Sequence, residues 1–253
     1  MENGDKEKVK EKEQVITNKN LKQMTIGEIE TYVKDLEEKA NKPKAVTLPK
    51  KYEFESQRET LADFFDDIAD VVFNSSHFEK LDNPSIKMFL AGGAILSSFM
   101  KVPVNDMDLY FYTEEDFTNF KKSIEDGASL ISETDRSVTY CRDGQVFQLC
   151  KVFGSEQDIF KAFDYSVCCV AMPVEIGYND DKEETIFNIG DFIFGETFIS
   201  DLMSKSLVFN TKTLYPLNSF IRLKKYLGKG FEINTANMMK LALAVNVLEL
   251  KTV

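Results

Sequence analysis

Apolar and polar residues follow two different periods along the chain, and the change from one to the other divides it into segments. An apolar residue at every third or fourth position predicts amphipathic helices over residues 25–41 and 56–72, and Thr25 with Glu28 and Ser56 with Glu59 predict a capping box at the start of each. Asn41-Lys42-Pro43 ends the first helix, and the lysines and prolines up to residue 51 indicate a linker. Short apolar runs bounded by turn residues predict strands at 87–91, 107–112, 130–131, 137–141, 146–152 and 163–172. Arg142-Asp143-Gly144 predicts a tight turn between the strands at 137–141 and 146–152.

The order of these segments predicts the fold class. A helix over residues 94–100 follows the first strand, and another, capped by Thr113 and Asp116, follows the second. This order is typical of an α+β fold with a mixed sheet of the α/β type. After a loop at 177–184, helical spacing returns over 191–205, 216–229 and 235–251. We therefore expect a charged arm without fixed structure (1–24), an amphipathic helix and linker (25–51), a sheet domain (52–189) and a small, mostly helical C-terminal domain (190–253).

Composition narrows the class of protein. The 253 residues are 43% hydrophobic, which suits a folded core, and no apolar run approaches the ~20 residues that span a bilayer. The charged start MENGDKEKVKEKEQ does not resemble a secretion signal. Four cysteines without CxxC spacing and a single histidine argue against a zinc cluster. We expect no membrane partner, reduced cysteines and a cytoplasmic location, in a host cytoplasm or associated with a virion if the protein is viral.

Charge is divided unevenly along the chain. Residues 1–51 hold 12 basic and 10 acidic side chains, whereas the remaining 202 hold 19 basic and 32 acidic ones, a net charge of −13. Such an acidic body disfavours broad binding to nucleic acid but leaves room for a metal site made of carboxylates. The helix at 25–41 could pack on its own body, dimerise or bind a protein partner.

Two carboxylates mark a candidate site. Asp106 and Asp108 stand two residues apart at the start of a predicted strand, so both side chains lie on one face while Met107 lies on the other. Like charges this close repel unless a cation lies between them, which favours a divalent metal. Upstream, an apolar strand runs into Gly92-Gly93 and a new helix, a turn that lets a backbone approach phosphate closely.

Asp164 is the third carboxylate of the candidate site. It opens the apolar segment predicted as a strand at 163–172, where an acidic residue is costly to bury without a partner. If that strand lies beside the strand at 107–112, the three aspartates converge. Three carboxylates can hold two Mg²⁺ ions, one activating an attacking hydroxyl and one binding phosphates.

These residues resemble a known family. Gly92-Gly93, twelve intervening residues, Asp106-x-Asp108 and a later Asp164 are similar to the nucleotidyltransferase superfamily, which includes DNA polymerase beta and tRNA nucleotidyltransferases. The segment from residue 147 to 172 is similar to the strand–helix–strand that supplies the third aspartate, especially in nucleotidyltransferase-like proteins of large phages and viruses. The resemblance implies a nucleotidyltransferase-like catalytic domain, metal-binding roles for the three aspartates and a phosphate-binding role for the glycines.

The resemblance also implies a reaction. A nucleoside monophosphate would pass from an NTP such as ATP to a hydroxyl acceptor, with two Mg²⁺ ions and release of pyrophosphate. Arg222, Lys224 and Lys225 on the predicted helix at 216–229 could bind the triphosphate or an RNA acceptor, or could simply form a solvated basic face. The competing hypothesis is a nucleotidyltransferase-like fold used as a binding or structural component of a larger phage or viral assembly.

Overall fold

The structure is a computed structural model that describes residues 25–40, 54–81, 84–179 and 184–246. The chain forms two compact units. The larger unit, within residues 45–234, contains the sheet and helices α3 to α8. The smaller unit combines segments from the two ends of the chain, within 1–44 and 235–253. The fold is α+β with a mixed sheet, as the sequence predicts.

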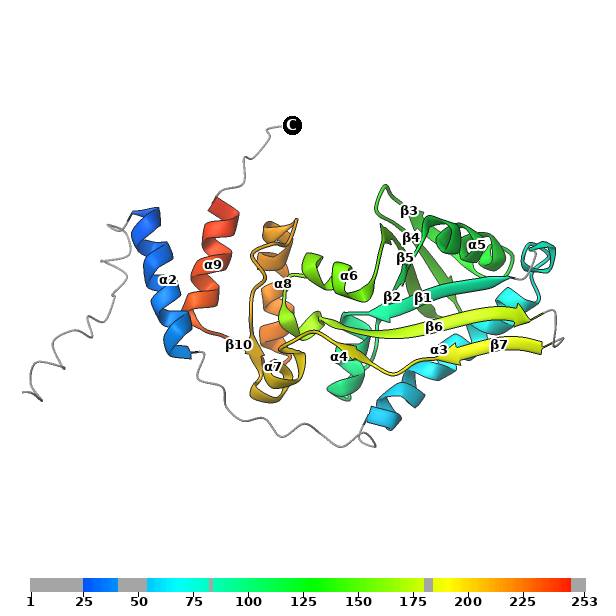
Figure 1. The fold of residues 1–253 in the computed structure, drawn as a ribbon, viewed down its shortest axis with the longest axis horizontal. Helices are drawn as coiled ribbons and strands as arrows, with labels where there is room; N and C mark the ends of the chain where they lie inside the picture. The colour runs from blue at the N-terminus through cyan, green and yellow to red at the C-terminus, as the bar shows by residue number, and fades with distance from the viewer. Residues whose placement is uncertain (1–24, 41–53, 82–83, 180–183, 247–253) are drawn as a thin grey trace, which may run out of the picture. The chain divides into compact units, whose positions relative to one another are not determined.

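The main sheet has the strand order β3-β4-β5-β2-β1-β6-β7, and β8 pairs with β6 at its side (Figure 1). Strand β2 is parallel to β5, whereas all the other pairs of this sheet are antiparallel. The strands are β1 (Ser85–Ala91), β2 (Asp106–Phe111), β3 (Ser129–Glu133), β4 (Ser137–Arg142), β5 (Gln145–Phe153), β6 (Val170–Asn179), β7 (Glu184–Ile189) and β8 (Ile193–Phe194).

Helices cover the sheet because one side of each carries apolar residues. Residues Leu61, Phe65 and Ile68 of α3 are buried, and Phe64 contacts Phe147 of β5 at 5.6 Å between ring centroids. The described helices of the larger unit are α3 (Glu55–Phe73), α4 (Gly93–Phe99), α5 (Glu114–Ile124), α6 (Glu156–Ala162), α7 (Phe198–Ser204) and α8 (Pro216–Gly228), with short 3-10 turns η3 (Phe78–Lys80) and η4 (Ser166–Cys168). A small parallel pair joins β9 (Ser206–Leu207) to β10 (Glu232–Ile233).

Several local predictions are confirmed. The side chain of Thr113 accepts a hydrogen bond from the amide of Asp116 and caps α5. Asp143 and Gly144 have φ angles of 49° and 83°, the left-handed pair that a tight turn between β4 and β5 requires. The predicted cap at Ser56 is wrong, because α3 begins one residue earlier, behind Phe54, without a side-chain cap.

Three predictions of secondary structure are wrong. The segment predicted as a strand at 163–172 contains η4, and β6 begins only at Val170. Asp164 therefore precedes the strand, and β6 lies beside β1 and not beside β2. Residues 177–184, predicted as a loop, include the end of β6 and the start of β7, with residues 180–183 outside the described part of the chain. Residues 191–205, predicted as one helix, contain β8 and the shorter helix α7.

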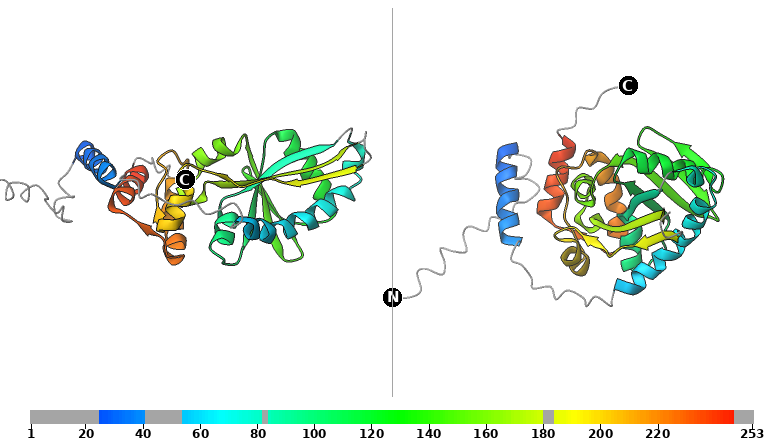
Figure 2. Two further views of the ribbon diagram at one scale, coloured as in Figure 1. Left: turned by 60° about the horizontal axis from the view of Figure 1, so that its bottom comes forward. Right: turned by 45° about the vertical axis from the view of Figure 1, so that its right-hand side comes forward.

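The smaller unit is a pair of helices, α2 (Ile26–Ala40) and α9 (Thr235–Asn246), which lie side by side (Figures 1 and 2). Glu28 accepts hydrogen bonds from the amide and hydroxyl of Thr25, so the predicted capping box begins α2. Val33 and Leu241 are buried.

The arm 1–24 and the linker after residue 41 lie outside the described residues. A partner for α2 and the four domain boundaries stay predictions. Among the described helices, none combines the length and the apolar sequence that a membrane span requires.

Close packing at Gly195 gives a prediction about stability. A Cβ at this position would lie 2.5 Å from the Cβ of Cys169 and 3.0 Å from its carbonyl oxygen. We expect Gly195→Ala to lower the free energy of unfolding by about 1–3 kcal/mol, measured as a lower urea midpoint. Gly228→Ala is the control, because no atom lies within 4 Å and alanine favours the last turn of α8. A Gly195→Ala variant as stable as the control would contradict the packing.

Candidate functional site

Asp106 and Asp108 lie on one face of β2, with Met107 buried on the other, as their spacing predicts. Asp106 is exposed and Asp108 is half-buried. Burial, and then repulsion from Asp106, raises the pKa of Asp108 to about 6, while Arg222 and Lys225 oppose the shift. A carboxylate pair held this way needs a positive charge to be stable in its ionised form.

Asp164 is held between α6 and η4 by the loop before α8. The amide of Asn210 donates to the carbonyl of Asp164, and its side-chain amide donates to the carbonyl of Phe163, both at 2.8 Å. Asp164 is only 4% exposed, and its Oδ2 pairs with Nη1 of Arg222 at 2.8 Å. Its Oδ1 is buried with no hydrogen-bond partner among the described residues. Burial raises the pKa of Asp164, and Arg222 opposes that shift.

The turn predicted to bind phosphate joins β1 to α4. Gly92 has a φ of 81°, which favours glycine, and its amide donates to the carbonyl of Val170 at 3.0 Å. Gly93 begins α4, and a side chain there would meet no atom within 4 Å. One turn further along α4, the hydroxyl of Ser97 accepts a hydrogen bond from Nζ of Lys229 at 3.0 Å. This bond connects the end of α8 to the helix that follows the glycines.

The basic residues of α8 divide between two sides of the helix. At about 100° per residue, Lys225 lies about 60° around the helix from Arg222, whereas Lys224 lies on the opposite side. Arg222 also donates from Nη2 to the hydroxyl of Tyr226 at 2.7 Å, and that hydroxyl lies 2.9 Å from Sγ of Cys168. The buried Tyr226 and Cys168 therefore hold the guanidinium beside Asp164.

The structure thus brings most of the predicted residues toward one region. Asp108 and Asp164 both interact electrostatically with Arg222 and Lys225, and Lys229 interacts with Asp106. Lys224 lies away from this group. Sequence reasoning did not single out Ser97, Tyr226 or Lys229 as site residues. The spacing of Lys229, seven residues after Arg222 and therefore on nearly the same side of the helix, is a signal that could have found it.

The donor set has the chemistry that Mg²⁺ requires, since carboxylate oxygens are its preferred protein ligands. The repelling pair on β2 and the buried, unpartnered Oδ1 of Asp164 both fit a divalent cation. In the arrangement described, Asp164 is paired with Arg222. Across the described residues, no group of three or more His, Cys, Asp or Glu side chains is arranged to hold a metal ion. The fit therefore rests on the Asp106–Asp108 pair, with Asp164 as the neighbouring carboxylate.

Comparison with known proteins identifies relatives of the sequence. A sequence model described as "Gabija anti-defense 2 family protein" matches residues 55–205, which include all three aspartates and end before α8. A protein of Bacillus phage SPbetaL7 with the name "Gabija anti-defense 2" is 27% identical over 166 residues. That alignment covers 64% of this chain and 38% of the phage protein, so the chain spans well under half the length of that relative.

Solved structures with a similar arrangement include tRNA-processing and CCA-adding enzymes. One described as "tRNA-processing enzyme (apo form I)" aligns with a TM-score of 0.48 and 13% identity, over 80% of this chain and 49% of the other. The "Thermotoga maritima CCA-adding enzyme complexed with tRNA_CCA" aligns with a TM-score of 0.48 and 12% identity, over 73% of this chain and 42% of that one. Similarity at this level identifies neither activity nor substrate.

Proposed function

We propose, starting from the fact that the chain belongs to the Gabija anti-defense 2 family, that it is a Mg²⁺-dependent nucleotidyltransferase. One observation carries the proposal. Asp108 of β2 and the separate Asp164 interact with the same cationic residues of α8, Arg222 and Lys225. Carboxylates for a metal beside cations for phosphates are the two elements that phosphoryl transfer needs, because its catalysis is mainly positioning and charge stabilisation.

Each residue has a role in this proposal. Asp106 and Asp108 would hold Mg²⁺, with Asp164 as the third ligand, and the bound metal would neutralise phosphate charge and activate the acceptor hydroxyl. Arg222, Lys225 and Lys229 would bind the triphosphate beside the Gly92-Gly93 turn. Arg222 would exchange its ion pair with Asp164 for a phosphate oxygen, which frees the carboxylate. Burial raises the pKa of Asp164, which suits this carboxylate to accept the hydroxyl proton.

The bond changes follow from these roles. The acceptor oxygen bonds to the α-phosphorus of the NTP, the bond between the α- and β-phosphates breaks, and pyrophosphate leaves. The acceptor could be RNA, a small molecule or a protein side chain. The acidic body makes a long nucleic acid the less favoured acceptor. By its family, the protein would act against the Gabija defence, in the cytoplasm of a phage-infected host.

A second candidate function has its own supporting observation. The helices α2 and α9 form a compact unit of their own. Such a unit could attach the protein to a partner, and the larger unit would then serve as a binding component without transferring nucleotides.

Nucleotide binding and transfer separate the two functions. The full chain is incubated with Mg²⁺, each α-labelled NTP, and RNA or protein fractions from a bacterial lysate. We expect at least one NTP to bind and its label to appear in one fraction, and Asp106→Ala to reduce transfer by about 10³-fold or more. Asp126→Ala, an exposed aspartate outside the site, is the control. A folded wild-type chain that binds no NTP with Mg²⁺ would overturn the proposal.

A further inference from the structure

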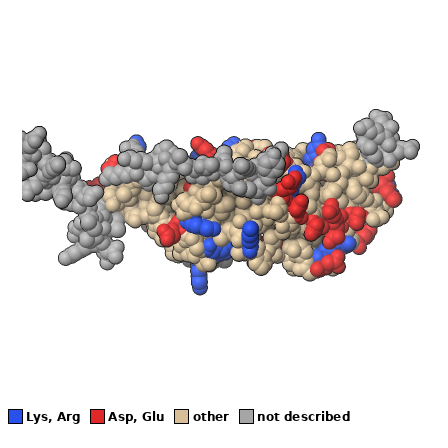
Figure 3. All heavy atoms as spheres, turned by 90° about the horizontal axis from the view of Figure 1, so that it is seen from below, with Lys and Arg blue, Asp and Glu red and all other residues tan. Residues whose placement is uncertain are grey.

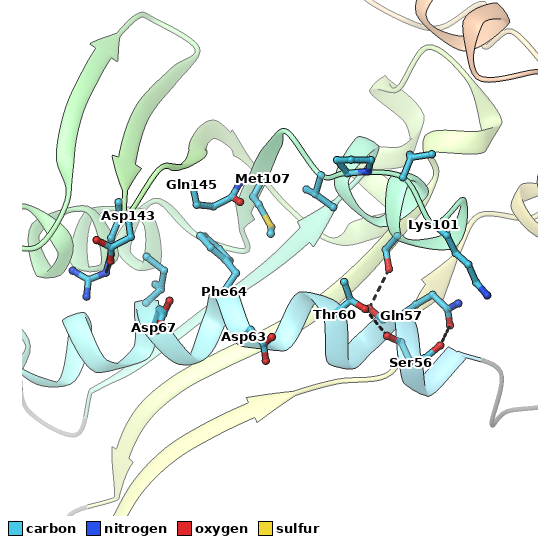
Figure 4. A pocket seen from close by; sticks show the side chains of 16 residues that line it. Ser56, Gln57, Thr60, Asp63, Phe64, Asp67, Lys101, Met107, Asp143 and Gln145 are labelled. Carbon is cyan, nitrogen blue, oxygen red and sulfur yellow. Dashed lines mark hydrogen bonds and ion pairs between the residues drawn. The ribbon is translucent and has the colours of Figure 1, made fainter.

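A groove runs along α3, and we name it the α3 groove. It is lined by α3, by residues 101–104 after α4 and by the turn between β4 and β5, and its volume is about 790 Å³ (Figure 4). Met107 turns its side chain into the groove from β2. Because its neighbours Asp106 and Asp108 face the other side of the strand, the groove lies on the face of the sheet opposite the candidate site.

The base of the α3 groove is apolar. Phe64 points from α3 toward Met107 and Gln145 (Figure 4). The ring of Phe64 packs against Phe147, with 5.6 Å between the ring centroids. The loop above contributes Val102, Pro103 and Val104. An apolar floor with polar groups at its rim is the usual composition of a binding cleft, and 790 Å³ lies within the usual range of about 300–1,000 Å³.

The charged residues that line the α3 groove are Asp63, Asp67 and Asp143 together with Lys101 and Arg142, and the outer side of α3 adds further acidic residues. Helix α3 carries six acidic residues and one arginine, and acidic side chains gather over it on the face shown in Figure 3. Asp67 on α3 and Asp143 on the turn lie at one end of the groove, and Lys101 lies at the other (Figure 4). Arg142 also lines this end, where it donates to the carbonyl of Gly127 at 2.8 Å and pairs its Nε with Oδ2 of Asp143 at 3.6 Å. Because Arg142 balances Asp143, the negative charge that the groove presents to a ligand comes from Asp67 and Asp63 on α3.

We propose that the α3 groove binds a basic amphipathic helix of a partner protein. The lining of α3 extends from Ser56 to Ile68, which is about 18 Å or three helical turns. The volume accommodates a few apolar side chains and not a whole helix. A helix laid along the groove would insert side chains at i, i+3, i+4 and i+7 and present lysine or arginine to Asp63 and Asp67. The acidic residues of α3 disfavour nucleic acid as the occupant.

Synthetic peptides test this inference directly. The first probe is a fluorescent peptide of about three helical turns with leucine on one face and lysine on the other. A lysine/serine version removes the apolar face, and a glutamate/leucine version reverses the charge. We expect the lysine/leucine peptide to bind the full chain saturably in fluorescence anisotropy, and each other peptide to bind at least about tenfold more weakly.

Charge reversal on α3 assigns the binding to the groove. Asp63→Lys combined with Asp67→Lys should weaken the lysine/leucine peptide at least about tenfold. The matched control is Glu59→Lys combined with Asp66→Lys, which makes the same charge change on exposed residues of the same helix outside the groove. We expect the control to change affinity by less than about threefold at physiological salt, because screening reduces the effect of distant charges. Circular dichroism confirms that both variants are folded.

Three results would overturn the proposal. The first is that the wild-type chain does not bind the lysine/leucine peptide saturably. The second is an equal loss in both pairs of variants, which would indicate attraction by net charge alone. The third is a dimer in sedimentation that Asp63→Lys with Asp67→Lys dissociates while the control does not. That result would assign the groove to a second copy of this chain. Nucleotide binding plays no part in these measurements, so they are independent of the proposed function.

Discussion

Asp108→Asn is expected to abolish nucleotidyl transfer and, at the same time, to make the metal-free protein more stable. Asp108 is half-buried beside Asp106, and both burial and repulsion disfavour its charged form. Asparagine keeps the shape of the side chain and removes the charge. The pKa of Asp108, raised from 3.8 to about 6, corresponds to a penalty of about 3 kcal/mol for ionised Asp108 at neutral pH. Partial exposure reduces that figure, so we expect a gain of about 1–2 kcal/mol in the free energy of unfolding.

Two measurements on the same variant separate function from folding. Urea denaturation with a chelator reports the stability of the metal-free chain, and label transfer with Mg²⁺ should fall by about 10³-fold or more. With Mg²⁺ present, the wild type should recover stability and the variant should not, because binding to the native state alone stabilises it. Asp66→Asn, on the exposed side of α3, should change neither quantity. If the metal-free Asp108→Asn variant is less stable than the metal-free wild type, then ionised Asp108 stabilises the fold, which contradicts the expected cost of its charge.

The β2 half of the site could be predicted from the sequence because it depends on local geometry. The period of a strand alone places Asp106 and Asp108 on one face and Met107 on the other, and the burial of β2 confirms it. The turn at Gly92 likewise follows from local conformation, since its φ of 81° favours glycine. Short-range rules of this kind also identified the cap at Thr113 and the turn at Asp143-Gly144.

The environment of Asp164 could not be predicted, because it is made by residues far along the chain. The apolar run from Phe163 onward has the composition of a strand, yet Tyr165 forms an isolated bridge with Phe209 and its hydroxyl donates to Ser219. Those contacts hold the segment in a form that no local pattern encodes. Similarly, phenylalanines 192, 194 and 198 suited a helix by spacing, but Phe194 packs on Phe99 and its strand pairs with β6. Tertiary contacts overrode propensity in both cases.

Arg222→Ala is expected to destabilise the protein more than any other single change at the site, because it leaves Asp164 without its counter-charge. Asp164 is 4% exposed, and its second oxygen already has no hydrogen-bond partner among the described residues. Breaking a buried pair costs about 3–5 kcal/mol. The Arg222 side chain is 45% exposed, so water can replace part of its effect, and we expect a loss of about 2–3 kcal/mol. The affinity for NTP should fall in parallel if Arg222 also binds phosphate.

A double-mutant cycle isolates the ion pair from the loss of each side chain. Asp164→Asn removes the charge that Arg222 balances, so combining it with Arg222→Ala should recover part of the stability. We expect a coupling energy of about 1–2 kcal/mol. The exposed pair of Lys87 and Glu175, 3.7 Å apart, is the control, and its cycle should give about 0.5 kcal/mol or less. Equal coupling in the two cycles would mean that Asp164 is accessible to water. In that case Asp164 would lack the burial on which the proposed function depends. It is this burial that makes an unpaired Asp164 carboxylate costly, and that cost favours binding of a metal when Arg222 leaves.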